Sequence, residues 1–428
     1  MTKRTLTFTT AVLLALNTMI GGGIFVNPKQ LAIVAGSLSP LGYVIAACLM
    51  LPLILSVTEL ARLQPVSGGL YVYSKSYVSP LAGFLSGWAY FLSKATSAAF
   101  LVHTVNTFFQ NHFSILQGIP PLVLDASLII FLTTLHAIGI SITSNIQYFF
   151  SFMKFTPLLF GFAAGFIAFN GSNLSLLPPD LSLSTISAAV PVCLYALVGF
   201  EIICSIGGFI ENPARNIRRT ILTAFGIVTA VAILFQLLMF GALGSELAYA
   251  KEPMLALGCT WLNGNIWLAK LMNGLVFASI TGGAFFMIGS NCWNLFTLAK
   301  DGNLPFTKSL TATNRFGSPW IALILQAVTS ILMIGISSQQ LPLQNMVVFS
   351  LFGSFLMTCF AAFNASKLNL LNIPRFVPLL AIGTCAYVLG MCFSNILKYG
   401  VSLSFLSFFA VGLIATILVR CTKKEDQP

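Results

Sequence analysis

Long apolar runs, separated by short polar or Gly/Pro-containing segments, follow one another along the whole chain. A helix that crosses a membrane needs about 20 mostly apolar residues, and these runs reach that length. Strands of a membrane β-barrel would be about 10 residues long and would alternate in polarity, which these runs do not. The pattern therefore predicts an all-α polytopic membrane protein with twelve transmembrane helices, near residues 8–34, 38–62, 80–109, 121–142, 147–169, 187–209, 217–243, 264–298, 317–337, 342–366, 374–396 and 400–420.

The composition agrees with this class. Of the 428 residues, 57% are hydrophobic and only 7% are charged. A soluble domain carries about 25% charged residues, so a soluble enzyme or a secreted module is excluded. The nine cysteines are scattered without a Cys-x-x-Cys pair. We therefore expect buried thiols instead of a disulfide framework or a metal site, and no cofactor is implied.

The basic residues are distributed unevenly between the two sides of the membrane. With twelve spans, both termini lie on one side. Of the 21 Lys and Arg residues, three lie in segments on the opposite side, three lie within spans (Lys94, Lys154 and Lys270), and the other 15 lie on the side of the termini. Because basic residues favour cytoplasmic loops, we expect both termini in the cytoplasm and the chain in the plasma membrane, the inner membrane in a bacterium. This bias explains the net charge of +11 without a nucleic-acid partner.

Two spans are interrupted near their middle. The first contains three consecutive glycines, Gly21 to Gly23, and glycine costs a helix roughly 1 kcal/mol relative to alanine. We interpret the triplet as an unwound segment of the kind found in transporter helices; close helix packing is the alternative. The sixth span is interrupted at Gly199, at Glu201 and at Gly207-Gly208.

The positions of the two interruptions predict an internal repeat. They fall in spans one and six, and two copies of five spans have opposite orientations in the membrane. We expect one transmembrane domain over 1–428, with a first repeat at about 8–169, an inverted second repeat at about 187–366 and two accessory helices at about 374–420.

Facing helix breaks favour a zwitterionic ligand. An unwound segment leaves backbone N–H groups without helical partners, and the N-terminus of a half-helix directs positive partial charge into the gap. A carboxylate suits that end, while the free carbonyls at the other end suit an ammonium group. An α-amino acid or a related amine is therefore the expected substrate class.

Four segments resemble one known family. GGGIFVNP (21–28) is similar to the first-helix signature of the amino acid–polyamine–organocation permeases, and residues 59–93 resemble their cytoplasmic loop and third helix. LYALVGFEIICSIGGFIENPARNIRRTI (194–221) resembles the sixth helix with its loop, and residues 299–323 resemble the loop after the eighth helix. The matches are collinear over most of the chain and are nearest the basic amino acid/polyamine antiporters, which include arginine/agmatine antiporters.

The resemblance implies roles for particular positions. The first-helix amides at Gly21–Gly23 would hold the substrate carboxylate, and Gly22 lacks the hydroxyl of the serine found in many members. Tyr195 stands where the exchangers have a tryptophan lid. Ala98 and Met287 replace an asparagine and a tryptophan that hold arginine, which weakens an arginine assignment. The predicted substrate-binding residues are Met19, Ile20, Gly21, Gly22, Gly23, Lys94, Ala98, Tyr195, Ala196, Gly199 and Met287.

Three ionisable residues within the spans are candidates for coupling or selectivity. Glu201 matches a proton-sensing glutamate of the exchangers, and its alternative role is a structural carboxylate. Lys154 stands where proton-coupled members have a lysine in place of a sodium ion, and its alternative is snorkelling to the interface. Lys94 is near mid-depth; if it lines the pocket it repels a cationic side chain, and its alternative is an internal pair with a carboxylate or carbonyls.

The remaining predictions concern gating and the class of protein. Glu59 and Arg62 are interpreted as a gate or loop-anchoring pair, or else as solvated charges. His136 is expected to be a bonded, buried histidine. The chain lacks HExxH spacing and a GxSxG turn, so an enzyme is not expected. We predict a secondary amino-acid transporter, linked to protons by Glu201 and Lys154, working by symport or by exchange, with a homodimer as one possible assembly; a channel or receptor-like protein is the alternative.

Overall fold

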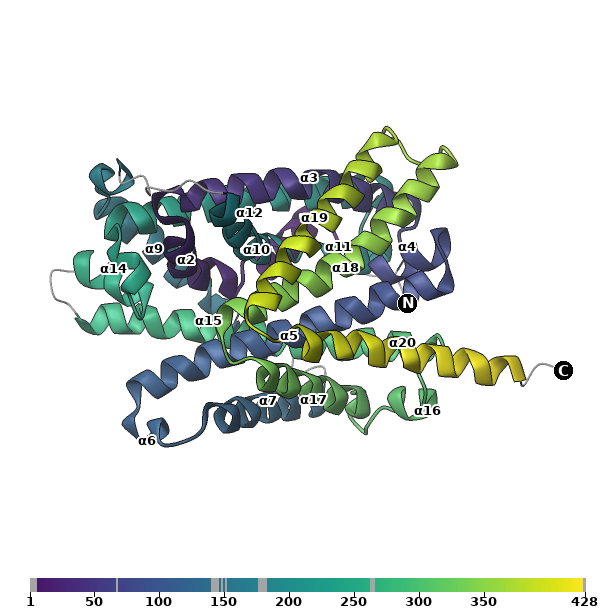
Figure 1. Cartoon of the computed structure of the whole chain (residues 1–428). Coiled ribbons are helices and arrows are strands. Elements are labelled where there is room, and N and C mark those ends of the chain that lie inside the picture. Colours follow the sequence, from purple (N-terminus) through teal and green to yellow (C-terminus); the bar gives the residue numbers. More distant parts are fainter. Residues whose placement is uncertain are drawn as a thin grey trace.

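The computed structural model describes residues 6–66, 68–139, 146–147, 149–150, 152–175, 183–261 and 266–425. Regular structure within these ranges is helical, apart from one isolated bridge between Leu6 and Ile210. The helices form one elongated bundle in which most long helices run along a common direction (Figure 1).

The first expected span is built as two helices, α1 (Phe8–Met19) and α2 (Gly22–Ala35). The third expected span is one long helix, α5 (Pro80–His112). Its start is fixed by Pro80 in the first turn and by the Ser79 hydroxyl, which accepts a hydrogen bond from the Ala82 amide at 3.1 Å. The elements after α2 are η1 (Gly36–Leu38), α3 (Ser39–Leu63), α4 (Gly69–Tyr77), α5 (Pro80–His112), α6 (Ser114–Gln117), α7 (Pro121–Ala137), α9 (Phe155–Ile167) and η2 (Gly171–Ser175).

The second half of the described chain also begins with an interrupted helix. The sixth expected span consists of α10 (Leu183–Leu197), α11 (Glu201–Ser205) and η3 (Gly207–Phe209). The later elements are α12 (Pro213–Leu243), α13 (Glu246–Tyr249), α14 (Pro253–Trp261), α15 (Ile266–Lys300), α16 (Thr307–Leu310), α17 (Trp320–Ile336), α18 (Gln340–Lys367), α19 (Phe376–Lys398) and α20 (Ser402–Glu425).

Six helical stretches of the described residues are long and apolar enough to cross a membrane: Gly22–Leu63, Pro213–Leu243, Trp267–Lys300, Gln340–Lys367, Phe376–Lys398 and Ser402–Val419. This confirms the predicted polytopic, all-helical class. The expected ranges 121–142, 147–169 and 187–209 each contain helix over their described residues. Short helices that the hydropathy pattern did not predict, such as α4 and α14, occupy the segments between the apolar runs.

Helix α5 lies at the centre of the bundle. It packs against α18, α15, α4 and α17, while α12 packs against α3, and α18 against α19 (Figure 1). Because α5 is covered on several sides, nearly all of its residues from Ala82 to Asn106 are buried, polar ones included. A helix covered in this way can carry polar side chains toward a site inside the protein.

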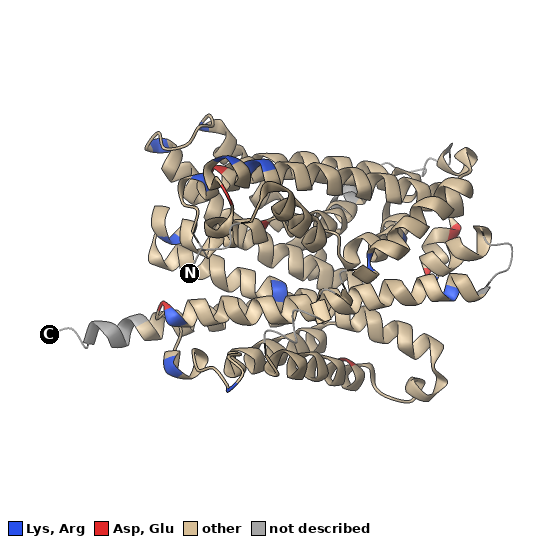
Figure 2. Ribbon diagram, turned by 180° about the vertical axis from the view of Figure 1, so that it is seen from behind, with Lys and Arg blue, Asp and Glu red and all other residues tan. Residues whose placement is uncertain are grey.

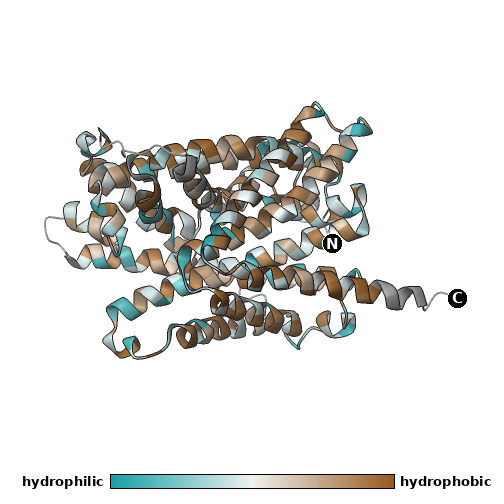
Figure 3. Cartoon of the chain, in the orientation of Figure 1, coloured by the Kyte–Doolittle hydropathy of each residue, from teal (hydrophilic) through white to brown (hydrophobic). Residues whose placement is uncertain are grey.

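The surface of the bundle is apolar along its length and polar at its ends. Outward-facing residues such as Phe152, Phe166 and Leu403 are 76%, 76% and 84% exposed, and hydrophobic colour dominates outer helices such as α20 (Figure 3). Lys and Arg gather toward the end at which both chain termini lie (Figure 2). A lipid environment around the middle of the bundle accounts for this pattern, since an exposed apolar belt would be unfavourable in water.

Candidate functional site

A cavity of about 310 Å³ lies between the two broken helices. Its wall is completed by α5, α15 and α18, as well as by the segment that precedes α9. The lining residues are Leu14, Asn17, Thr18, Met19, Gly21, Gly22, Gly23, Ser93, Lys94, Ser97, Leu101, Gln147, Lys154, Tyr195, Ala196, Val198, Gly199, Ser279, Gly283, Phe286, Met287, Val347 and Leu351.

The predicted break in the first span is present. Helix α1 ends at Met19, and α2 begins at Gly22 after Gly21, whose extended backbone carries no side-chain cap. The first amides of α2 therefore lack a capping side chain where the helix meets the cavity. The alternative of close packing also applies, because a Cβ atom at Gly23 would lie 3.1 Å from Cδ1 of Tyr195. The glycines thus open the helix and let the two broken spans approach each other.

The break in the sixth span lies between Leu197 and Glu201, the facing ends of α10 and α11. Gly199 has φ +118°, a backbone conformation that favours glycine. A Cβ atom there would lie 3.2 Å from the Cα atom of Met19. The end of α1 and the unwound part of the sixth span are therefore in direct contact beside the cavity.

Lys154 reaches the break in the first span. Its ammonium group donates to the carbonyl oxygens of Asn17 at 2.5 Å and of Ile20 at 3.1 Å. These carbonyls belong to the last turn of α1 and to the residue that follows it, where helical partners run out. Lys154 is 7% exposed, so the alternative of a side chain snorkelling to the interface does not describe it.

Lys94 lines the cavity and is paired at the same time. Its Nζ atom lies 2.8 Å from Oε1 of Glu201, and the Gly199 amide donates to Oε2 of Glu201 at 2.8 Å. The ring of Tyr90 lies 5.0 Å from the ammonium group. The internal pair weighed as an alternative for Lys94 is thus present, and the pair ties α5 to the break in the sixth span.

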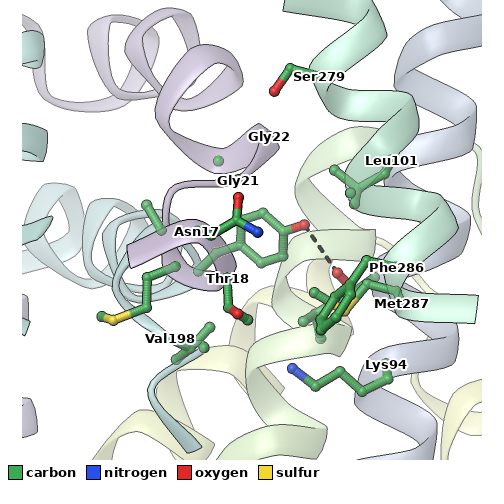
Figure 4. A pocket seen from close by; sticks show the side chains of 18 of the residues that line it. Asn17, Thr18, Gly21, Gly22, Lys94, Leu101, Val198, Ser279, Phe286 and Met287 are labelled. Carbon is green, nitrogen blue, oxygen red and sulfur yellow. Dashed lines mark hydrogen bonds between the residues drawn. The ribbon is translucent and has the colours of Figure 1, made fainter. Parts of the chain in front are cut away.

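Ten further predicted positions can be placed against the cavity wall. Met19, Gly21, Gly22, Gly23, Tyr195, Ala196, Gly199 and Met287 line it, whereas Ile20 and Ala98 are buried outside the lining. The Tyr195 hydroxyl lies 3.1 Å from that of Ser97, and its ring meets Phe100 edge-on. Met287 shares the wall with the aromatic Phe286 (Figure 4).

Six polar residues that line the cavity were not predicted from the sequence: Asn17, Thr18, Ser93, Ser97, Gln147 and Ser279. In α5, Ser97 follows Lys94 by three positions and Ser93 by four, and both spacings place side chains on one helix face. That spacing around a mid-span lysine is the signal that could have found the two serines. Ser279 is 2% exposed, and its hydroxyl has no hydrogen-bond partner among the described residues.

Glu59 and Arg62 form an ion pair away from the cavity. Glu59 is fully buried and accepts hydrogen bonds from Arg62 at 3.0 Å, from Arg218 at 3.1 Å and from the amide of Asn372 at 3.0 Å. The alternative of solvated charges is therefore wrong for Glu59. Arg218 joins α12 to α3 through this carboxylate.

A second ion pair lies at the same end of the bundle. Lys75 of α4 and Asp301, which follows α15, are 2.8 Å apart, and Tyr71 also donates to Asp301, at 2.6 Å. Partial burial alone would raise the pKa of Asp301, but the hydrogen bonds from Lys75 and Tyr71 outweigh it and lower the pKa. The pKa of Lys75 is raised, chiefly by its hydrogen bond to Asp301.

Two further side chains within the predicted spans can be placed. His136 is buried, and its Nε2 atom lies 2.7 Å from the carbonyl oxygen of Phe285, as expected of a bonded histidine. Lys270 is exposed. Within the described ranges, no group of three or more His, Cys, Asp or Glu side chains is placed to hold a metal ion.

Comparisons with known proteins show the family of the chain. The family model described as "Amino acid permease" matches residues 6–427. The chain is 25% identical to the serine/threonine exchanger SteT of Bacillus subtilis, over 89% of each chain. It is 28% identical to the arginine/agmatine antiporter of Chlamydia pneumoniae, over 73% of this chain and 67% of that one. It is 24% identical to the human cystine/glutamate transporter, over 91% and 80%.

These relatives are transporters and not enzymes, and they support an amino-acid transporter that is an integral, multi-pass protein of the plasma membrane. The resemblance that the glycine triplet, the loop motifs and the sixth-span segment carry is confirmed over nearly the whole chain. The chain belongs to the amino acid permease family, within the amino acid–polyamine–organocation superfamily.

Proposed function

We propose that this chain is a secondary active amino-acid transporter that binds its substrate between the two broken helices and works by alternating access. The observation that carries the proposal is the meeting of both breaks at one cavity, with the start of α2 and the end of α10 on its wall. Transporters place discontinuous helices at such a midplane site. Gly21–Gly23 hold the substrate carboxylate, and Tyr195 closes over the bound molecule.

Proton linkage is assigned to Lys154 and Glu201. The ammonium group of Lys154 holds the unwound end of α1 through two carbonyls. Release of a proton from Lys154 would loosen that end, and its return would fix it again. Glu201 is bonded to the amide of Gly199 in the other break. Each group can thus link its protonation to the geometry of one broken helix, in symport or in exchange of amino acids or amines.

The architecture proposed for this function has twelve spans, of which the first ten form an inverted repeat of five plus five, inside a single domain over 1–428. Both termini lie in the cytoplasm. The basic end of the bundle, which also contains both termini (Figure 2), supports this orientation. Glu59, Arg62 and Arg218 then form a cytoplasmic gate contact between α3 and α12. A homodimer is the proposed assembly.

Counterflow with purified protein in liposomes tests the function. Liposomes are loaded with one unlabelled amino acid, and uptake of the same labelled amino acid is followed; serine, glutamate, leucine and arginine are tested in turn. A carrier predicts transient accumulation above equilibrium in loaded liposomes only. Uptake that is equal in loaded and empty liposomes for all four amino acids would contradict the proposal and favour a channel.

A further inference from the structure

The charged residues on the cavity wall are of one sign. Among the described lining residues, Lys94 and Lys154 are charged, and no Asp or Glu is present. Glu201 lies behind the wall: it is 1% exposed, does not line the cavity, and is bonded to two residues that do, Lys94 and Gly199. A cationic side chain in this cavity would therefore meet two ammonium groups without an accessible carboxylate. Such an arrangement discriminates against cations by repulsion.

The two ammonium groups differ in what they can offer to a ligand. Lys154 is committed to the carbonyls of Asn17 and Ile20, which end the first half-helix. Lys94 points into the cavity beside Val198 and Thr18, with Gly21 and Gly22 toward the opposite side (Figure 4). An ammonium group has three N–H donors, so Lys94 can donate a hydrogen bond to a second carboxylate while Glu201 stays close to it. An amino acid whose α-carboxylate meets the start of α2 would extend its side chain toward Lys94.

We propose that the transporter prefers amino acids with a side-chain carboxylate, which Lys94 receives, and that Glu201 takes up one proton as this carboxylate arrives. The inference rests on the proposed transport function and names its substrate class. Two carboxylates that share one ammonium group in a water-poor site repel each other, and protonation of one of them relieves the repulsion. The proton comes from the aqueous side that is open to the cavity. It neutralises Glu201, and the substrate's negative side chain replaces Glu201 as the partner of Lys94. When the substrate leaves on the other side of the membrane, Glu201 releases the proton there and pairs with Lys94 again.

The surroundings of Glu201 leave Lys94 as its cationic partner. On α5, Lys94 is bonded to Glu201 and Tyr90 lies near both groups. Cys204 of α11 also lies near Glu201, and its carbonyl accepts a hydrogen bond from Tyr73 of α4. Tyr195 of α10 lies near Lys94. Helix α1 has no titratable side chain. The arginines of α12 lie in its first two turns, where Arg218 is bonded to Glu59. When a substrate carboxylate draws on Lys94, no second cation among these groups is placed to keep Glu201 charged.

Competition in the counterflow assay tests substrate preference. Labelled serine is exchanged, and unlabelled glutamate, serine and arginine compete. In the wild type we expect glutamate to compete best and arginine least. In Lys94→Met/Glu201→Gln, which removes both charges, the half-inhibitory concentration of glutamate relative to serine should rise at least about tenfold, a difference of about 1.4 kcal/mol. Lys94→Arg should keep the wild-type order, and Lys270→Met, an exposed lysine of α15, is the matched control.

A pH-sensitive dye inside the liposomes tests the proton in the wild type alone, so the result does not depend on folding of a variant. Glutamate uptake should acidify the lumen more than serine uptake. For each molecule transported, glutamate should bring about one more proton into the lumen than serine does. Equal acidification per molecule for the two substrates overturns the proton step. Competition by arginine that matches or exceeds glutamate overturns the substrate class. If serine exchanges and glutamate does not compete, this inference fails alone; if none of the amino acids exchanges, the proposed function fails.

Discussion

Lys154 and Lys94 each place an ammonium group at the wall of the same cavity, but different partners hold them. Lys154 is bonded to two main-chain carbonyls, whereas Lys94 is bonded to the carboxylate of Glu201. A carbonyl carries only a partial charge, so the positive charge of Lys154 stays uncompensated, while Lys94 and Glu201 sum to zero. The partners of a buried lysine, more than its depth, therefore decide what it can do. Lys154 responds to changes in the backbone of α1, and Lys94 responds to another charge that enters the cavity.

The largest expected effect comes from breaking the Lys94–Glu201 pair on one side only. Lys94→Met leaves a buried carboxylate without its cation, which costs about 3–5 kcal/mol, whereas the double variant Lys94→Met/Glu201→Gln is expected to be near neutral. Thermal unfolding of the purified protein in detergent compares the two. Equal melting temperatures of the single and the double variant would show that the two side chains do not depend on each other.

Replacing Lys154 by methionine should have the next largest effect. The carbonyls of Asn17 and Ile20 lose their donor, at about 1–3 kcal/mol for each buried group left unbonded. We expect uptake to fall at least about tenfold and the remaining uptake to lose its dependence on pH between mildly acidic and neutral conditions. Lys270→Met is the control on an exposed position. A Lys154→Met protein with an unchanged pH profile would remove Lys154 from proton linkage.

A smaller effect is expected from Gly199→Ala, which disturbs the break that Glu201 holds. The backbone at φ +118° disfavours a residue with a Cβ atom, at a cost of about 1–3 kcal/mol. The new methyl group would also lie 3.2 Å from the Cα atom of Met19. Gly226→Ala is the matched control, because nothing lies within 4 Å of its Cβ position in α12. Initial uptake rates should fall for Gly199→Ala and stay near wild type for Gly226→Ala.

The smallest effect is expected at a lysine–carboxylate pair that has the same N–O distance as Lys94 and Glu201 but is in contact with water. Lys75 and Asp301 are also 2.8 Å apart, but their side chains are 42% and 32% exposed. Solvent screening limits such a pair to about 0–1 kcal/mol, so Asp301→Asn should barely change the melting temperature. The pKa of Asp301 is lower in the folded protein than in the unfolded chain, where it is near 3.8. The contribution of Asp301 to the free energy of unfolding is therefore complete above pH 3.8 and is lost as the pH falls through the folded pKa. The contribution of Lys75, whose pKa is raised from 10.5, is lost only at more alkaline pH. A loss at neutral pH as large as that of Lys94→Met would contradict the role given to burial.

Local features of the chain were enough to predict the class of fold and both helix breaks. The glycine triplet and Gly199 act on the backbone at their own positions, so the sequence around them carries the information. The depth of Lys94 and Lys154 likewise follows from counting residues along an apolar run. The pair of Glu59 with Arg62 lies within one helical turn, which made it visible as well.

Contacts between distant helices could not be predicted in this way. Glu201 is 107 residues from Lys94, and Arg218 is 159 residues from Glu59. Each contact depends on how two helices are rotated against each other, which hydropathy does not determine. The rotation of α5 also explains why Ala98 was wrongly predicted to line the cavity: it is buried outside the cavity wall, while the neighbouring Ser97 faces Tyr195.

Protection of a single introduced thiol tests most directly whether the amino acid sits between the broken helices. Ser279→Cys, a buried lining position of α15, is labelled with a small methanethiosulfonate in a background without Cys48, Cys259 and Cys421, and intact mass reports the rate. Lys270→Cys on the same helix is the control. An amino acid at ten times its Kd leaves about one-eleventh of the sites empty, so labelling at 279 should slow about elevenfold with a transported amino acid and stay unchanged at 270. Equal labelling at 279 with and without the amino acid would place the substrate elsewhere and contradict binding between the broken helices.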